Sequence, residues 1–111
     1  MKLLITASIL LSMTYLTEET PKKPTFTYYG ATWCGPCRKM KKGVLNHPEV
    51  KAELKKWDVE ILEHTKKEDR PKFSKERIDY LPTIVIMKGD RAERMTGYRS
   101  KDALLKRLRL E

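Results

Sequence analysis

Cysteine and histidine are both scarce in this sequence. Its 111 residues include two cysteines, Cys34 and Cys37, and two histidines, His47 and His64. A structural zinc site takes four ligands, and the two histidines lack the short spacing of zinc-finger ligands, so we expect no metal site. No additional cysteine supports a thiol peroxidase, and no clear glutathione site supports a glutathione-using enzyme.

Acidic residues are fewer than basic ones. The chain carries 24 Lys and Arg against 15 Asp and Glu, a formal net charge of +9. Such charge could attract acidic partners, nucleic acid or an anionic membrane surface. No nucleic-acid motif accompanies it, and aromatic residues are not interleaved with the basic residues 38–42. We interpret the charge as a solvated surface and expect no nucleic-acid partner.

A chain of this length without internal repeats makes one domain.

The N-terminal region contains no charged residue between Leu3 and Thr17. Lys2 followed by the apolar block Leu3–Leu11 is the pattern of a secretory signal peptide, and the block is shorter than the ~20 residues that span a bilayer. We expect residues 1–19 to be a signal peptide or N-terminal anchor and the protein to be extracytoplasmic, periplasmic or secreted, free or membrane-associated. Ser12-Met13-Thr14 is a poor cleavage site. The alternative is a cytoplasmic protein in which Lys2–Ser8 is a first strand and Ile9–Leu16 a first helix.

The two cysteines are separated by Gly35 and Pro36. Strand-like residues 26–31 precede them, and helix-compatible residues 38–42 follow. A strand that leads into a helix through Cys-x-x-Cys is typical of a dithiol/disulfide redox site. Residues three apart on a helix have Cβ atoms roughly 5–6 Å apart, which suits a disulfide. An inert structural disulfide is the weaker alternative, because closing so short a loop adds little stability.

The start of a helix is also a position that activates a thiol. Pro36 falls in the first turn, where its missing N–H costs nothing. Cys34 then lies at the helix N-terminus, where unpaired N–H groups and the helix dipole favour its thiolate. Arg38 and Lys39 add positive charge nearby, and the thiolate is the species that attacks a disulfide.

Residues Ala31-Thr32-Trp33-Cys34-Gly35-Pro36-Cys37 closely resemble the active-site motif of the thioredoxin family. Residues Tyr80-Leu81-Pro82-Thr83-Ile84-Val85-Ile86 are similar to the cis-proline strand of the same family. The resemblance implies an α/β, thioredoxin-like fold for residues 25–111. We therefore expect a central mixed β-sheet, with parallel strands and an antiparallel C-terminal hairpin, flanked by helices. The break at Asn46-His47-Pro48 also resembles exported thioredoxin-like domains.

The resemblance also implies roles for residues of the motif. Cys34 would be the exposed attacking cysteine and Cys37 the buried resolving one, with their redox-active disulfide as the only redox group and no other cofactor. Gly35 and Pro36 would support this site, and Trp33 would form a partly exposed apolar wall beside it. A core aromatic is the alternative for Trp33.

On the substrate side, the resemblance implies a cis bond before Pro82, with the backbone of Leu81 paired to an extended substrate chain. Gly97 would lie near the same groove, and a simple turn glycine is its alternative. One position departs from the family pattern. Many thioredoxins carry a buried aspartate six residues before the first cysteine, where this chain has Tyr28. A phenol is a poor general base at neutral pH, so water, a distant carboxylate such as Glu63, or no base would serve the resolving cysteine.

These observations favour a thiol–disulfide oxidoreductase that reduces protein disulfides, because Gly-Pro between the cysteines resembles the reducing members of the family. We expect a monomer that acts on protein disulfide substrates and takes electrons from an upstream reductase or a membrane thiol partner. The alternative is a non-catalytic thioredoxin-fold binding module or assembly subunit.

Periodicity and turn signals predict the elements along the chain. We expect strands at residues 25–31, 59–65, 82–87 and 91–96. We expect helices at residues 34–45, from residue 48 with Val50, Leu54 and Trp57 on one stripe, at residues 71–78 with Phe73 and Ile78 buried, and after a Ser100 cap with Leu104, Leu105 and Leu108 buried.

Overall fold

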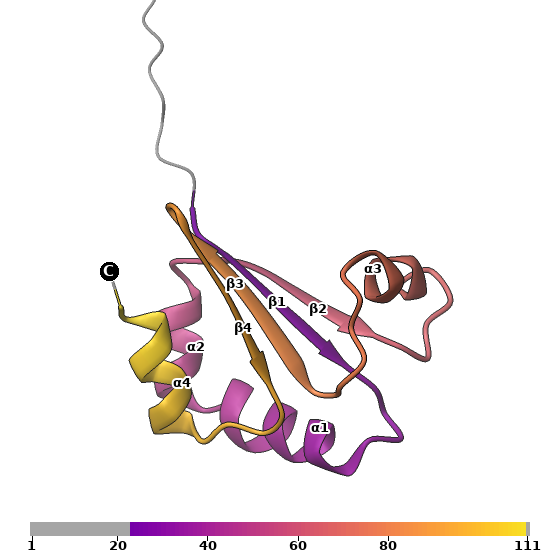
Figure 1. Cartoon of the computed structure of the whole chain (residues 1–111). Coiled ribbons are helices and arrows are strands. Elements are labelled where there is room, and N and C mark those ends of the chain that lie inside the picture. The colour runs from indigo at the N-terminus through magenta and orange to yellow at the C-terminus, as the bar shows by residue number, and fades with distance from the viewer. Residues whose placement is uncertain (1–22, 111) are drawn as a thin grey trace, which may run out of the picture.

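Four strands form one mixed sheet in the computed structural model, which describes residues 23–110 (Figure 1). The strands are β1 (Thr25–Gly30), β2 (Asp58–Glu63), β3 (Thr83–Lys88) and β4 (Arg91–Thr96). Their order in the sheet is β2-β1-β3-β4. β1 pairs in parallel with β2, whereas β1–β3 and β3–β4 are antiparallel. The predicted thioredoxin-like fold class is confirmed.

Five helical segments flank the sheet: α1 (Gly35–Met40), η1 (Lys41–Leu45), α2 (Pro48–Leu54), α3 (Arg70–Lys75) and α4 (Lys101–Leu108). Figure 1 shows α1, α2 and α4 on one side of the sheet and α3 on the other. Within the described part of the chain, no helix is long and apolar enough to cross a membrane.

Alternation along β1 divides the core between the two faces of the sheet. Phe26 and Tyr28 belong to the larger cluster, which includes Met40 of α1, Val50 of α2 and Leu104 of α4. Tyr29 points to the other face and packs with Leu62 of β2 and Phe73 of α3. Side chains two apart on a strand share a face, so one strand supplies both layers.

The predicted elements are present, with differences at their ends. The single helix predicted for residues 34–45 is wrong in detail: the α-helix ends at Met40 and a π-helical turn, η1, continues it to Leu45. Met40, Val44 and Leu45 are buried. His47 caps α2, with its Nδ1 accepting the Glu49 N–H at 3.2 Å.

Further boundaries also differ from the prediction. α2 ends at Leu54, so Trp57, predicted on the stripe of this helix, lies beyond it. β2 covers Asp58–Glu63 rather than residues 59–65, because its register is fixed by parallel pairing with β1. α3 covers Arg70–Lys75 and stops before residue 78, because Arg77 adopts a positive φ of 53° that ends the helix. Phe73 is buried, whereas Ile78 is only partly buried.

The C-terminal half follows the prediction. β3 lies in the interior of the sheet, a two-residue turn at Gly89 and Asp90 leads into β4, and Ser100 caps α4 through the Ala103 N–H. The predicted signal peptide or anchor at residues 1–19 and its alternative, a first strand and helix, fall on residues outside the described part of the chain.

Candidate active site

The two cysteines meet at the start of α1. Cys34 is the N-cap residue of this helix, and Cys37 lies in its first turn. They are joined by a disulfide, with their Cα atoms 5.2 Å apart. The Cys37 N–H also donates to Cys34 Sγ at 3.2 Å, the side-chain cap expected of an N-cap residue. Pro36 stands in the first turn, and the Cys34 N–H closes a turn onto the Ala31 carbonyl at 3.1 Å.

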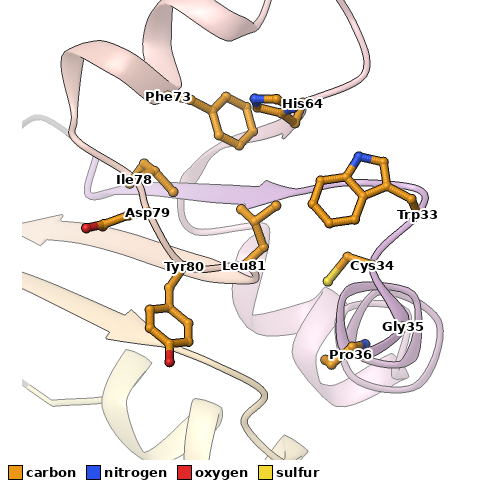
Figure 2. A pocket seen from close by; sticks show the side chains of 10 residues that line it. All are labelled: Trp33, Cys34, Gly35, Pro36, His64, Phe73, Ile78, Asp79, Tyr80 and Leu81. Carbon is orange, nitrogen blue, oxygen red and sulfur yellow. The ribbon is translucent and has the colours of Figure 1, made fainter.

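A groove of about 590 Å³ opens beside Cys34 (Figure 2). Trp33, Gly35 and Pro36 line one side of it, and Leu81 lines it opposite Cys34. Trp33 is 64% exposed, so the alternative of a core aromatic at this position is wrong. The structure therefore brings the cysteine motif and Leu81 into one surface feature.

The proline strand reaches the cysteines through Leu81. The Leu81–Pro82 peptide bond is cis, and the Leu81 side chain packs against the cluster formed by Ala31, Cys34 and Cys37. Leu81 precedes β3, and among the described residues no turn, loop or side-chain hydrogen bond uses its backbone groups. Pro82 itself is fully buried.

Gly97 follows β4 directly and is not among the residues that line the groove. Its N–H donates to the Pro82 carbonyl at 2.7 Å, and its φ of 87° is in the region that favours glycine. Gly97 therefore occupies a turn position that is hydrogen-bonded to Pro82, next to the groove residue Leu81.

The far wall of the groove contains residues to which the sequence gave no role. They are His64, Phe73, Ile78, Asp79 and Tyr80. The ring of His64 stands edge-on to both Trp33, at 6.4 Å between centroids, and Phe73, at 5.1 Å. Tyr80 is 67% exposed. Asp79 is the one residue with a carboxylate among the described residues that line the groove. No local pattern predicted that these residues share one groove, because α3 and the end of β2 bring them together only in the folded chain.

On the other side of the disulfide, Cys37 borders a small cavity of about 50 Å³. Its lining includes Tyr28, Thr32 and Glu63 as well as two cations, Arg38 and Lys41. The Tyr28 O–H donates to the Cys37 carbonyl at 3.0 Å. Cys34 and Cys37 thus border two different spaces, the open groove and a smaller cavity with charged side chains in its lining.

Glu63 and Arg38 hold the segment before the cysteines. The Glu63 Oε2 accepts the Thr32 N–H at 2.8 Å, and an Arg38 N–H donates to the Thr32 carbonyl at 2.8 Å. The Thr65 N–H and O–H also donate to the same Glu63 oxygen, at 3.2 and 2.7 Å. Both backbone groups of Thr32 are therefore fixed by side chains from β2 and α1.

Tyr28 and Glu63, which both line this cavity, have pKa values shifted in opposite directions. Burial, and then the charge of Glu63, raises the pKa of Tyr28 to about 12, so its phenol is neutral at physiological pH. Burial alone would raise the pKa of Glu63, but hydrogen bonds from Thr65 and Thr32 and the charge of Lys41 outweigh it and lower that pKa below its ordinary value. Glu63 is therefore a carboxylate at neutral pH.

Within residues 23–110, no three His, Cys, Asp or Glu side chains are grouped closely enough to hold a metal ion.

Comparisons with known proteins agree with this arrangement. The family model described as "Thioredoxin-like domain" matches residues 15–110. A thioredoxin from Alicyclobacillus acidocaldarius subsp. acidocaldarius is 30% identical over 83 residues, which cover 74% of this chain and 75% of that protein.

Two solved structures are similar to this one. The solution structure of a thioredoxin from Thermus thermophilus is 26% identical, with a TM-score of 0.66 over 78% of this chain and 72% of that chain. Mitochondrial thioredoxin 3 from Saccharomyces cerevisiae, in its oxidised form, is 20% identical, with a TM-score of 0.62 over 78% of this chain and 76% of that chain. The second likeness bears on the fold alone.

Proposed function

Because the chain belongs to the thioredoxin-like domain family, we propose that this thiol–disulfide oxidoreductase reduces disulfide bonds in other proteins. In the first step, the Cys34 thiolate attacks a substrate disulfide, forms a mixed disulfide and releases one substrate thiolate. In the second, Cys37 attacks the Cys34 sulfur, which restores the internal disulfide and releases the second substrate thiolate.

One observation carries this order of attack. Cys34 lines the open groove, whereas Cys37 lines the much smaller cavity on the other side of the disulfide. A substrate that lies in the groove meets the Cys34 sulfur first. The 5.2 Å separation of the two Cα atoms then lets Cys37 reach the Cys34 sulfur with little backbone motion.

The groove also supports a mode of substrate recognition. The backbone of Leu81 is not used by turn, loop or side-chain hydrogen bonds among the described residues, and it stands opposite Cys34 (Figure 2). An extended substrate chain can pair with it as an added strand, which gives affinity with little dependence on substrate sequence. Trp33 and Tyr80 supply exposed aromatic surface on either side.

Cysteine variants test the mechanism directly. Incubated with a disulfide-bonded protein such as insulin, the Cys37→Ser variant should accumulate covalent mixed disulfides on a non-reducing gel, because nothing resolves them. The Cys34→Ser variant should trap none and should reduce insulin no faster than buffer with dithiothreitol. Trapping by Cys34→Ser instead would reverse the roles. A wild type that is no faster than Cys34→Ser would favour the alternative, a binding module.

We further propose that the protein works as a monomer outside the cytoplasm and receives its electrons from an upstream donor. Uncharged residues 3–17 after Lys2 support export, and Gly-Pro between the cysteines supports a reducing role. A reduction potential of about −270 mV, typical of thioredoxin, is expected for the Cys34–Cys37 pair. A potential near −120 mV would instead make it an oxidant. Mass spectrometry of the protein from its native cells tests the proposed export, because an intact Met1 would contradict cleavage of a signal peptide.

A further inference from the structure

The resolving step requires Cys37 to lose a proton, and the structure limits which group can take it. Tyr28 of β1 lines the cavity beside Cys37, and its O–H already donates to the Cys37 carbonyl at 3.0 Å. Burial and the charge of Glu63 raise its pKa to about 12, so the phenol holds its proton too tightly to act as a base.

Glu63 is the carboxylate that shares the cavity with Cys37. It enters from the end of β2, a different element from the one that carries Tyr28. Within residues 23–110, the hydrogen bonds to its carboxylate come from Thr32 and Thr65 and go to Oε2, which fixes the group and leaves Oε1 as an acceptor. The cavity volume of about 50 Å³ is enough for a water molecule, and its walls offer that water polar partners.

We propose that, within the function proposed above, Glu63 accepts the Cys37 proton through a water molecule in this cavity and so activates the resolving thiol. The proton passes from Cys37 Sγ to water and on to Glu63. The Cys37 electron pair forms the bond to Cys34 Sγ while the bond from Cys34 to the substrate sulfur breaks. The substrate leaves as a thiolate that takes a proton from solvent, and Glu63 returns its own proton to solvent.

The charges around Glu63 suit this role. Arg38 from α1 and Lys41 from η1 line the same cavity, so a thiolate that forms on Cys37 meets positive charge. Tyr28 from β1 faces it as a neutral phenol. Asp69, before α3, accepts the Glu63 N–H at 2.9 Å and so holds the backbone of this residue. Glu63 is ionised at neutral pH, which keeps it ready to accept a proton.

A disulfide dye separates the two steps in one experiment. Reduced protein mixed with excess 5,5′-dithiobis(2-nitrobenzoate) releases one coloured thiolate when Cys34 attacks and a second when Cys37 resolves. In Glu63→Gln, the amide oxygen can still accept the Thr32 N–H, so the first release should be unchanged. The second release should slow about tenfold or more at neutral pH, because a positioned base is lost.

The pH profile distinguishes proton transfer from a merely structural effect. In the wild type, the rate of second release should vary little between about pH 6 and about pH 8, because the base is already ionised. In Glu63→Gln it should rise about tenfold per pH unit, in proportion to hydroxide. Glu60→Gln is the matched control: Glu60 lies on the same strand but on the opposite face, where it pairs with Lys72, and this change should alter neither phase. In Tyr28→Phe, the rate of second release should depend on pH as it does in the wild type.

Several results would overturn the assignment. The first is a Glu63→Gln variant whose second release has the wild-type rate and pH dependence. The second is equal slowing of both releases in Glu63→Gln, which would point to loss of the Thr32 contact. The third is a Tyr28→Phe variant whose second release becomes proportional to hydroxide. If Glu63→Gln does not fold, a wild-type second release proportional to hydroxide overturns it as well. Failure of the proposed function itself looks different: the wild type would then give no second release.

Discussion

Gly30, at the end of β1, lies directly beneath the ring of Tyr28. A Cβ at this position would stand 2.7 Å from Tyr28 Cε1 and 2.7 Å from its hydroxyl oxygen. The ring is buried and its O–H donates to the Cys37 carbonyl, so it cannot move aside without loss of that hydrogen bond. The site therefore depends on a residue that carries no functional group.

Gly30→Ala should destabilise the protein by about 1–3 kcal/mol, the usual cost of overpacking a core. Gly43, in η1, is the matched control, because nothing lies within 4 Å of a Cβ added there. Gly43→Ala should stabilise by about 0.4–1 kcal/mol, since alanine has less freedom in the unfolded chain. Urea unfolding of the three proteins measures both effects. Equal stability of the two variants would contradict the close contact with Tyr28.

Among the elements, α4 best shows how a local signal and the tertiary core combine. Its Leu104, Leu105 and Leu108 are buried against the larger core cluster, and Ser100 caps it through the Ala103 N–H at 3.2 Å. Both features follow from sequence pattern alone, which explains why the predicted helix matches the observed one.

Ser100→Ala should lower the free energy of unfolding by about 1 kcal/mol, the typical cost of losing an N-cap. Ser74→Ala is the control: it makes the same change inside helix α3 at an exposed position, where alanine is the better helix former. Denaturant titration of the two variants gives the comparison. A Ser100→Ala variant as stable as Ser74→Ala would show that the cap contributes nothing.

Other elements show where sequence reasoning stops. The cysteine motif and the Leu81–Pro82 strand were predicted because each has a short, specific pattern. The end of α3 was not predicted, because it depends on a positive φ at Arg77. Local patterns assign that conformation to glycine or asparagine. The groove wall of His64 and Phe73 was missed for a different reason. Their rings meet at 5.1 Å only after β2 and α3 have packed together.

At the scale of the whole molecule, part of the net charge of +9 lies in a basic segment next to the active site. Arg38, Lys39, Lys41 and Lys42 follow the cysteines directly and all are exposed. Charges of one sign beside a reactive group raise the local concentration of oppositely charged reactants, and salt screens this effect over about 8–10 Å at physiological ionic strength.

The attack of Cys34 on a small anionic disulfide, dithiodiglycolate, should therefore slow several-fold as salt is raised from low to high concentration. Attack on cationic cystamine should accelerate over the same range, and attack on uncharged hydroxyethyl disulfide should change little. Stopped-flow rates for the three reagents test this. The same salt dependence for all of them would show that the basic segment does not influence approach to the sulfur.

The two tryptophans occupy contrasting environments. Trp33 is 64% exposed beside the disulfide, whereas Trp57 is 4% exposed and stands edge-on to Phe26 in the core, 6.5 Å between ring centroids. The unmodified chain thus carries two intrinsic fluorescent reporters at separate places. A soluble quencher such as iodide should dim the indole at the reactive end and spare the interior one. Emission from a Trp33→Phe protein would then follow unfolding alone, and emission from a Trp57→Phe protein would follow events at the sulfurs.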